Sequence, residues 1–240
     1  MKMIPQKDKV FIYFDRVILS CLCLLILFLP FKKAGVEIFA WSAFFLWLLK
    51  KILEYIIGAR RPILLKTELN KPLGVFIAIN LLSLVFSVNH GLSLRGFFGK
   101  ELKFMAIYFM LVETINSKER LKVVLVTIIA SALLILADAW AQYFMGVDFI
   151  NHIPLARLTA SFLNPNGFAG WLIVMIPLFC GLLGTGKFLG KTGKGVLFIL
   201  IMMLSVCLLL TYTRGAWLGL AVANRFAVNN RVQLSAFFVF

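Results

Sequence analysis

The stretch from Arg157 to Leu178 decides the fold, and it reads RLTASFLNPNGFAGWLIVMIPL. Pro165 has no N–H group and restricts Asn164 to an extended conformation, Asn166-Gly167 is a turn pair, and an uncharged run follows at once. A membrane helix is therefore expected to begin at about Asn166. The amino terminus of a helix is electropositive and carries open N–H groups, so this end suits an anion such as a phosphate. The alternative is a capped start of a span.

The composition places the chain in a membrane. Of its 240 residues, 62% are hydrophobic and only 15% are charged, which is too apolar for a soluble domain with a polar shell. The net charge of +15 would suggest nucleic acid in a soluble chain, but Lys- and Arg-rich cytoplasmic loops explain it here. Membrane lipid is therefore an expected partner, and nucleic acid is not. The cysteines lie in apolar runs without His or carboxylate neighbours, so neither a metal nor another cofactor is expected.

The apolar runs predict an all-α fold, a polytopic transmembrane helical bundle with about eight spans that forms a single transmembrane domain over residues 1–240. A span needs roughly 20 apolar residues, with about 17 as the lower end. Spans are expected near Val17–Phe31, Ala34–Leu49, Pro72–Val88, Gly96–Val112, Val123–Phe144, Gly167–Leu183, Val196–Tyr212 and from Gly215 onward. The fourth is the least apolar, because Lys100, Glu101 and Lys103 lie in its first half.

The distribution of Lys and Arg predicts the orientation. With the amino terminus in the cytoplasm, eighteen of the 25 Lys and Arg residues fall on inner segments and seven on outer ones, which agrees with the positive-inside rule. The oligomeric state stays open. The polar residues expected to face outward are His90, Arg95, Asp148, His152, Arg157, Asn164, Asn166 and Arg214.

A second informative stretch is TYTRGAWLGL, residues 211–220, where two expected spans meet with almost no loop. Arg214 would lie there at the membrane surface, and Gly215 and Gly219 form a Gly-x-x-x-Gly face for a neighbouring helix. Arg214 alone could snorkel to lipid headgroups. Arg157 is expected on the same side, and two guanidiniums beside a helix start can clamp a diphosphate.

Two further polar residues are weighed for chemistry. Asp138 falls in the outer half of the fifth expected span, so it should face protein or water, paired with Arg214 or Lys100. A proton-handling role is the alternative. His152 is kept as a candidate for catalysis, although a loop histidine is more often simply solvated.

Three motifs resemble the O-antigen ligase and O-antigen polymerase superfamily, multi-spanning bacterial enzymes of surface polysaccharide assembly. They are Arg157-Leu158-Thr159, Asn164-Pro165-Asn166-Gly167-Phe168-Ala169 and Thr213-Arg214-Gly215-Ala216-Trp217-Leu218-Gly219-Leu220. The resemblance extends over most of the chain, including Ser93-Leu94-Arg95 and Ala141-Gln142-Tyr143.

The resemblance implies glycan transfer from an undecaprenyl-pyrophosphate-linked donor to an acceptor, without a cofactor, at the outer face of the bacterial inner membrane. By that analogy Arg157 and Arg214 would hold the pyrophosphate, and Asn164 and Asn166 would shape the mouth of the site. The acceptor, the sugar and the choice between ligase and polymerase stay open.

The chain also departs from the family pattern. Family members carry about a dozen spans and a large later outer loop with a histidine, neither of which is found by Phe240, and polar residues interrupt the run after Leu220. We therefore expect the amino-terminal part of such an enzyme, truncated, and either inactive or completed by a partner, so its enzymatic status stays open. The alternatives are a transporter or flippase of lipid-linked sugars, and a non-catalytic membrane assembly subunit.

Overall fold

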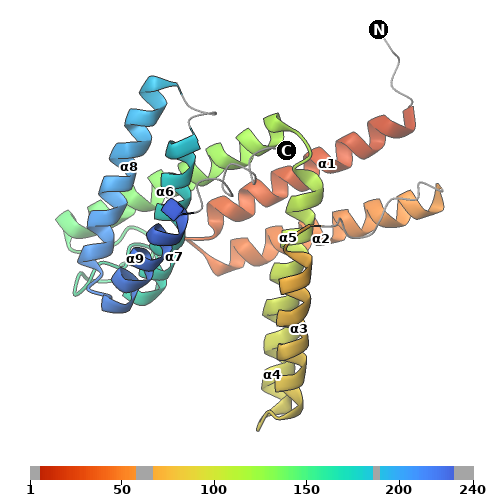
Figure 1. The fold of residues 1–240 in the computed structure, drawn as a ribbon, viewed down its shortest axis with the longest axis horizontal. Coiled ribbons are helices and arrows are strands. Elements are labelled where there is room, and N and C mark those ends of the chain that lie inside the picture. The colour runs from red at the N-terminus through yellow and green to blue at the C-terminus, as the bar shows by residue number, and fades with distance from the viewer. Residues whose placement is uncertain (1–5, 58–66, 186–189, 230–240) are drawn as a thin grey trace. The chain divides into compact units, whose positions relative to one another are not determined.

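The computed structural model describes residues 6–57, 67–185 and 190–229, and within these ranges the protein is helical with no β-strand (Figure 1). The predicted all-α class is therefore confirmed. The positions of the orientation count that fall outside the described ranges are Lys2, Arg60, Arg61, Lys66, Lys187 and Arg231. Asn230, one of the residues expected to interrupt the last apolar run, also lies outside them.

The chain divides into two compact units, and the prediction of a single domain stays a prediction. Unit 1 comprises Met1–Leu25 and Ala34–Asn116, and unit 2 comprises Ile26–Lys33 and Ser117–Phe240. The helices that lie wholly or mostly in unit 1 are α1 (Gln6–Phe28), α2 (Lys33–Ile56), α3 (Asn70–Val85), α4 (His90–Gly96), the π-helical η1 (Phe97–Glu101) and α5 (Leu102–Thr114). Unit 2 holds α6 (Lys118–Met145), α7 (Pro165–Thr185), α8 (Lys191–Leu210) and α9 (Arg214–Asn229).

Four helical segments in the described residues are long and apolar enough to cross a membrane: Val10–Phe28, Lys118–Met145, Pro165–Gly184 and Lys191–Leu210. The chain is thus a membrane protein by composition and helix length, but these criteria do not support the predicted number of about eight spans. The remaining helices fall short for identifiable reasons. α3 and α9 have 16 residues each, and α2 carries charged residues at both ends.

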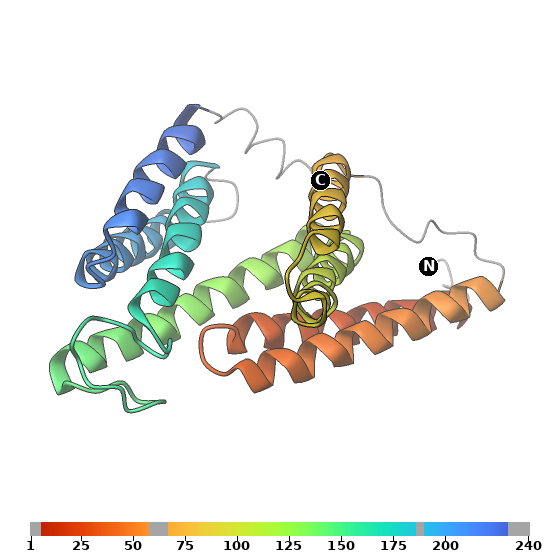
Figure 2. The ribbon, with the colours of Figure 1, turned by 90° about the horizontal axis from the view of Figure 1, so that it is seen from below.

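Helices α1, α2 and α5 form the core of unit 1. Ile18 and Leu22 of α1, Ala43 of α2, and Ile107 and Met110 of α5 are buried against one another. Helix α3 lies beside the continuous α4–η1–α5 segment in both Figure 1 and Figure 2, and none of its residues is buried. Unit 1 therefore has a three-helix core with one further helix attached at its surface.

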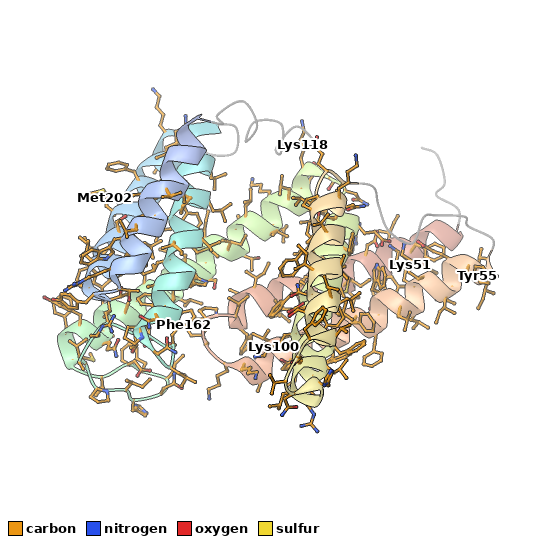
Figure 3. The ribbon with its side chains drawn as sticks, turned by 60° about the horizontal axis from the view of Figure 1, so that its bottom comes forward. Lys51, Tyr55, Lys100, Lys118, Phe162 and Met202 are labelled. Atoms are coloured by element: carbon orange, nitrogen blue, oxygen red, sulfur yellow. The ribbon has the colours of Figure 1, made fainter. Side chains whose placement is uncertain are left out.

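A network of buried charges joins the three core helices of unit 1. The Lys50 Nζ of α2 lies 2.8 Å from Asp15 Oδ1 of α1 and 2.7 Å from Glu113 Oε1 of α5. Lys51, labelled in Figure 3, lies 3.0 Å from the same Glu113 oxygen, and the indole N–H of Trp47 donates to the other at 2.7 Å. Because Lys50 is only 2% exposed, its ion pairs are screened little by solvent.

Helices α6, α7, α8 and α9 form the core of unit 2. Figures 1 and 2 both show α7, α8 and α9 side by side. Ile135 of α6, Phe168 and Leu172 of α7, and Leu204 of α8 are completely buried in this core. The expected close approach at Gly219 is modest, since an added Cβ would meet Ile173 Cδ1 of α7 at 3.7 Å, an ordinary van der Waals distance.

Candidate functional site

Four helix ends meet at one end of unit 2. Helices α6 and α8 finish there, at Met145 and Leu210, and helices α7 and α9 begin there, at Pro165 and Arg214. Two connections lie at this end, loop 146–164 and turn 211–213, and the Leu158 N–H donates to the Leu210 carbonyl at 3.3 Å. Residues that the sequence places more than 50 positions apart thus share one surface, which we call the α7/α9 end.

Arg157 joins the loop to the turn. Its Nε donates to the Thr211 carbonyl oxygen at 2.8 Å, and its Nη2 donates to the same oxygen and, at 3.1 Å, to Thr213 Oγ1. The side chain is half-buried, and within the described residues its Nη1 makes no hydrogen bond. The edge formed by Nε and Nη2 is therefore held by protein, and the Nη1 side is left for a ligand.

Thr213 connects Arg157 to the start of α7. Its hydroxyl accepts from Arg157 and donates to Asn166 Oδ1 at 3.2 Å. The oxygen of the Asn166 amide is thus engaged, while its NH₂ group remains a donor at an exposed position. Arg157, Thr213 and Asn166 form a continuous chain of side-chain hydrogen bonds across the α7/α9 end.

The start of α7 has a side-chain cap. Asn164 Oδ1 accepts from the Gly167 N–H at 2.6 Å, the Asn164 carbonyl accepts from the Phe168 N–H, and Pro165 occupies the first helical position. The helix begins one residue before the predicted Asn166. Fewer donors stay open than expected, because in the described residues only the Asn166 N–H of this turn lacks a partner.

The start of α9 is more open. The N–H groups of Ala216 and Trp217 donate to the Thr213 carbonyl, whereas those of Arg214 and Gly215 have no acceptor among the described residues. The Arg214 side chain is exposed and makes no hydrogen bond or ion pair in the part of the chain that the structure describes. Neither α7 nor α9 has an acidic residue in its first turn, so the positive end of each helix dipole is uncompensated there.

Gln142, near the carboxyl end of α6, is hydrogen-bonded to loop 146–164. The side chain is completely buried, and its Oε1 accepts from the N–H groups of Thr159 and Ala160 at 3.0 and 2.8 Å. Its Nε2 donates to the Ile153 carbonyl at 3.2 Å and to Thr159 Oγ1 at 2.9 Å. One amide therefore fixes two separate parts of the loop.

The carboxylates of this region are used inside the loop. Asp138 accepts from the Phe149 N–H and from the Ser161 hydroxyl, at 2.9 and 2.5 Å, and it is 4% exposed. The expectation that Asp138 faces protein is confirmed. Its partners within unit 2 are Ser161 and Phe149 and not Arg214, so the expected pairing with Arg214 is wrong, while pairing with Lys100 of unit 1 stays a prediction. Asp148 is fully buried and accepts from backbone N–H groups of residues 150, 151 and 153. Neither acid neutralises the arginines.

Backbone strain concentrates at the same place. Among the described residues, the non-glycine residues with positive φ are His152 (52°), Ala160 (47°) and Tyr212 (52°), and all three lie in loop 146–164 or turn 211–213. A left-handed conformation costs such residues of order 1–3 kcal/mol, and such strain clusters at functional sites. Asp148 accepts from the N–H of Ile153, next to His152, and Gln142 accepts from the N–H of Ala160, so hydrogen bonds hold the two strained segments of the loop.

Aromatic rings hold the loop against α7. Phe162, labelled in Figure 3, stacks on Phe168 with ring centroids 5.6 Å apart, and Phe168 stacks on Trp171 at 6.5 Å. Since Phe168 is completely buried, the loop is anchored by packing as well as by hydrogen bonds.

The structure brings together four of the five residues singled out from the sequence. Arg157 and Asn166 share Thr213 as a partner, Arg214 follows Thr213 directly, and Asn164 caps the helix that Asn166 opens. His152 is exposed in the same loop, and no described residue is bonded to its imidazole.

Sequence reasoning missed the roles of Gln142, Thr211 and Thr213. Thr213 lies beside Arg214 in the stretch TYTRGAWLGL, and this position is the feature of the sequence that could have indicated its role. In the described residues, no group of three or more His, Cys, Asp or Glu side chains is arranged to hold a metal. The α7/α9 end therefore offers donors and positive charge, the chemistry that binds an anion.

No protein-family model, curated protein or solved structure matches the chain. The choice of ligand therefore depends on the chemistry of the α7/α9 end itself. That chemistry is two arginines, two helix starts and exposed amide donors, set at the end of helices long enough to cross a membrane.

Proposed function

We propose that the α7/α9 end binds the diphosphate of a membrane-anchored glycan donor, and that the protein takes part in transferring the glycan from undecaprenyl pyrophosphate to an acceptor. The observation that carries the proposal is the convergence of two helix starts and two arginines through Thr213. Open donors are the Nη1 of Arg157, the guanidinium of Arg214, and the N–H groups at the start of α9.

The membrane context supports a lipid-linked anion over a soluble one. Helices α6, α7 and α8 are each long and apolar enough to span, and the donors lie at their shared end, where headgroups of the bilayer lie. A polyprenyl diphosphate has its charged group at that depth and its chain in the hydrocarbon. The proposed setting is the bacterial inner membrane, with about eight spans, a cytoplasmic amino terminus and the α7/α9 end facing outward.

The proposed chemistry is displacement at the anomeric carbon. An acceptor hydroxyl oxygen forms a bond to that carbon as the bond to the pyrophosphate oxygen breaks, and the leaving undecaprenyl pyrophosphate takes the electron pair. The hydroxyl proton passes to a base, for which His152 is the exposed candidate in loop 146–164. Negative charge grows on the leaving group, so fixed cations stabilise the transition state more than the ground state.

The hydrogen bonds of Arg157 limit how the two arginines can bind a diphosphate. Because Arg157 already uses Nε and Nη2 on the Thr211–Thr213 turn, it can meet a phosphate through its Nη1 side, while Arg214 keeps its whole fork. We therefore assign orientation to Arg157 and bidentate grip to Arg214. Asn166 supplies its amide NH₂ and its N–H, and Asn164 contributes through the cap of α7.

Binding of undecaprenyl pyrophosphate to the purified protein in nanodiscs tests the proposal. Arg214→Ala and Arg157→Ala should each weaken the Kd at least about tenfold, equivalent to about 1.4 kcal/mol. Lys118→Ala is the matched control, since Lys118 is an exposed cation at the opposite end of α6. If all three variants bound undecaprenyl pyrophosphate with the affinity of the original protein, the α7/α9 end would not be a diphosphate site. Loss of glycan transfer in cells by Arg157→Ala, with normal insertion, would favour an enzyme over a non-catalytic assembly subunit.

The second candidate is a transporter or flippase of lipid-linked sugars, and the buried charge network of unit 1 favours it. Buried ionisable groups on membrane helices often mark ion or proton pathways, and Lys50 with Asp15 and Glu113 is such a group. Reconstituted vesicles distinguish the two, because a flippase moves a fluorescent lipid-linked sugar between leaflets. A transferase leaves the leaflet distribution unchanged.

A further inference from the structure

Gln142 uses every hydrogen-bonding position of its amide that points into loop 146–164. Its oxygen takes two neighbouring backbone N–H groups, of Thr159 and Ala160, and its nitrogen donates to Ile153 and to the Thr159 hydroxyl. The side chain is 0% exposed, so no water competes for these bonds. A buried amide that is fully satisfied in this way fixes the backbone that it contacts.

The segment held by Gln142 continues directly to Arg157. Leu158, between Arg157 and Thr159, is 1% exposed and donates its N–H to the Leu210 carbonyl at 3.3 Å. One residue earlier, the Nε of Arg157 reaches the Thr211 carbonyl at 2.8 Å. Residues 157–160 thus form a strap that is fixed to α6 by Gln142 and to the end of α8 by Leu158 and Arg157.

Ala160 shows why the strap needs an external hold. Its φ of 47° lies in the left-handed region, which is unfavourable for a residue with a Cβ, and its N–H donates to Gln142 Oε1. If the amide is removed, the N–H groups of Thr159 and Ala160 are left buried without an acceptor, and the strained conformation loses its compensation. The strap is then expected to relax, and Arg157 moves with it.

We propose that Gln142 is the positioning residue for Arg157, and that through Arg157 it sets the affinity of the α7/α9 end for a lipid diphosphate. The second half of this inference rests on the proposed function; the first half depends only on the contacts of the strap. Gln142 does not touch the ligand in this arrangement. It acts by keeping the Nε and Nη2 of Arg157 on the turn, so that Nη1 stays directed to the anion.

The binding test uses the full chain in nanodiscs with undecaprenyl pyrophosphate as the probe. Gln142→Met keeps the side-chain volume and removes all four hydrogen bonds, and it should weaken the Kd about tenfold, as Arg157→Ala does. The Kd of the double variant should exceed that of either single variant by no more than about twofold, because both changes remove the same interaction. Gln142→Glu keeps the acceptor for both N–H groups but sets an oxygen against the Ile153 carbonyl, so it should recover only part of the affinity lost in Gln142→Met.

Ser131→Ala is the matched control. Ser131 is a buried polar residue of the same helix, and its hydroxyl donates to the Ile26 carbonyl at 3.2 Å, away from the strap. This variant also loses a buried hydrogen bond, so it reports the effect of destabilising α6 without moving Arg157. A loss of affinity in Ser131→Ala equal to that in Gln142→Met would overturn the inference.

A second measurement needs no ligand. Thermal unfolding of the two single variants and the double variant gives a cycle in which Arg157→Ala should lose at least about half of its destabilising effect in the Gln142→Met background. Additive effects would overturn the positioning role. If the original protein does not bind the lipid, the proposed function fails, and the unfolding cycle alone then decides whether Gln142 positions Arg157.

Discussion

The guanidinium of Arg157 caps the carboxyl end of α8: its Nε lies 2.8 Å from the carbonyl oxygen of Thr211, the C-cap residue that follows Leu210. A cation at this position satisfies a carbonyl that has no partner within the helix and also compensates the negative end of the dipole. The Nη2 of the same guanidinium donates to Thr213 Oγ1 and so joins loop 146–164 to the residue before Arg214. Arg157 therefore has a structural role that must be separated from ligand binding.

Arg157→Ala should lower the free energy of unfolding by about 1 to 2 kcal/mol, because it removes hydrogen bonds from a charged donor to a carbonyl and a hydroxyl. Arg157→Lys should recover part of this loss, since an ammonium can reach one acceptor but cannot reproduce the fork. Thermal unfolding in detergent without ligand measures the structural effect. A variant as stable as the original protein would show that the cap contributes nothing.

Asn164→Ala should destabilise α7 by about 1 kcal/mol, because the Gly167 N–H loses its side-chain acceptor. Asn164→Asp is the matched variant: its carboxylate still caps the helix and favours the positive end of the dipole. It should therefore keep the stability while adding a negative charge beside the arginines. Unfolding and lipid binding are both measured on Asn164→Asp. Normal unfolding with weakened binding of undecaprenyl pyrophosphate would separate the helix cap from the binding site.

The sequence predicted the positions of the helices well, whereas only four helical segments of the described residues are long and apolar enough to be the expected spans. Periodic apolar runs and turn pairs mark helix starts, so the beginning of α7 was displaced by only one residue. Whether a helix can cross a membrane depends on both its length and the number of charged residues in it. The second expected span, Ala34–Leu49, lies in a helix that carries Lys33, Glu37, Lys50, Lys51 and Glu54, which are more charges than a clear span holds.

For the candidate site, the sequence predicted the charged residues and missed their partners. Arg157 and Arg214 stand beside expected span ends, so their common surface follows from helix order alone. Thr211 contributes a backbone carbonyl, which no side-chain motif can reveal. The hydrogen bonds of Gln142 require the fold of loop 146–164, which the left-handed Ala160 allows and which propensity does not predict.

Lys50→Met should be the most destabilising single change of charge in unit 1, costing about 3 kcal/mol, because it removes the cation that buried Asp15 shares with Glu113. Glu113 keeps its pair with Lys51, which limits the loss. Lys103→Met is the matched control. The partner of Lys103, Glu37, has a side chain that is 35% exposed, so loss of that pair should cost no more than about 1 kcal/mol. Equal effects on unfolding would mean that the network of unit 1 is solvated.

Ser161→Ala should loosen loop 146–164 without unfolding α6. Ser161 donates to Asp138 Oδ2 at 2.5 Å, and its own carbonyl accepts from Asn151 Nδ2 at 2.8 Å, a bond that the substitution keeps. Asp138 would retain the Phe149 N–H, so the expected loss is about 1 to 3 kcal/mol. Limited proteolysis should then cut the loop faster than in the original protein. Unchanged cleavage would show that the hydrogen bond from Ser161 to Asp138 does not contribute to holding the loop.

Residues 152 and 214 should be labelled from the same side of the membrane, because loop 146–164 and turn 211–213 are joined by the bonds of Arg157 and Leu158. His152→Cys and Arg214→Cys, each in a background with the native cysteines replaced by alanine, can be treated with a membrane-impermeant maleimide. Lys118→Cys is the control from the other end of α6, whose 28 residues are enough to cross, and it should be labelled from the opposite side. Labelling of 152 and 214 from different sides would contradict the α7/α9 end itself. Labelling of both from the cytoplasm would preserve that geometry and remove the proposed outward-facing donor site.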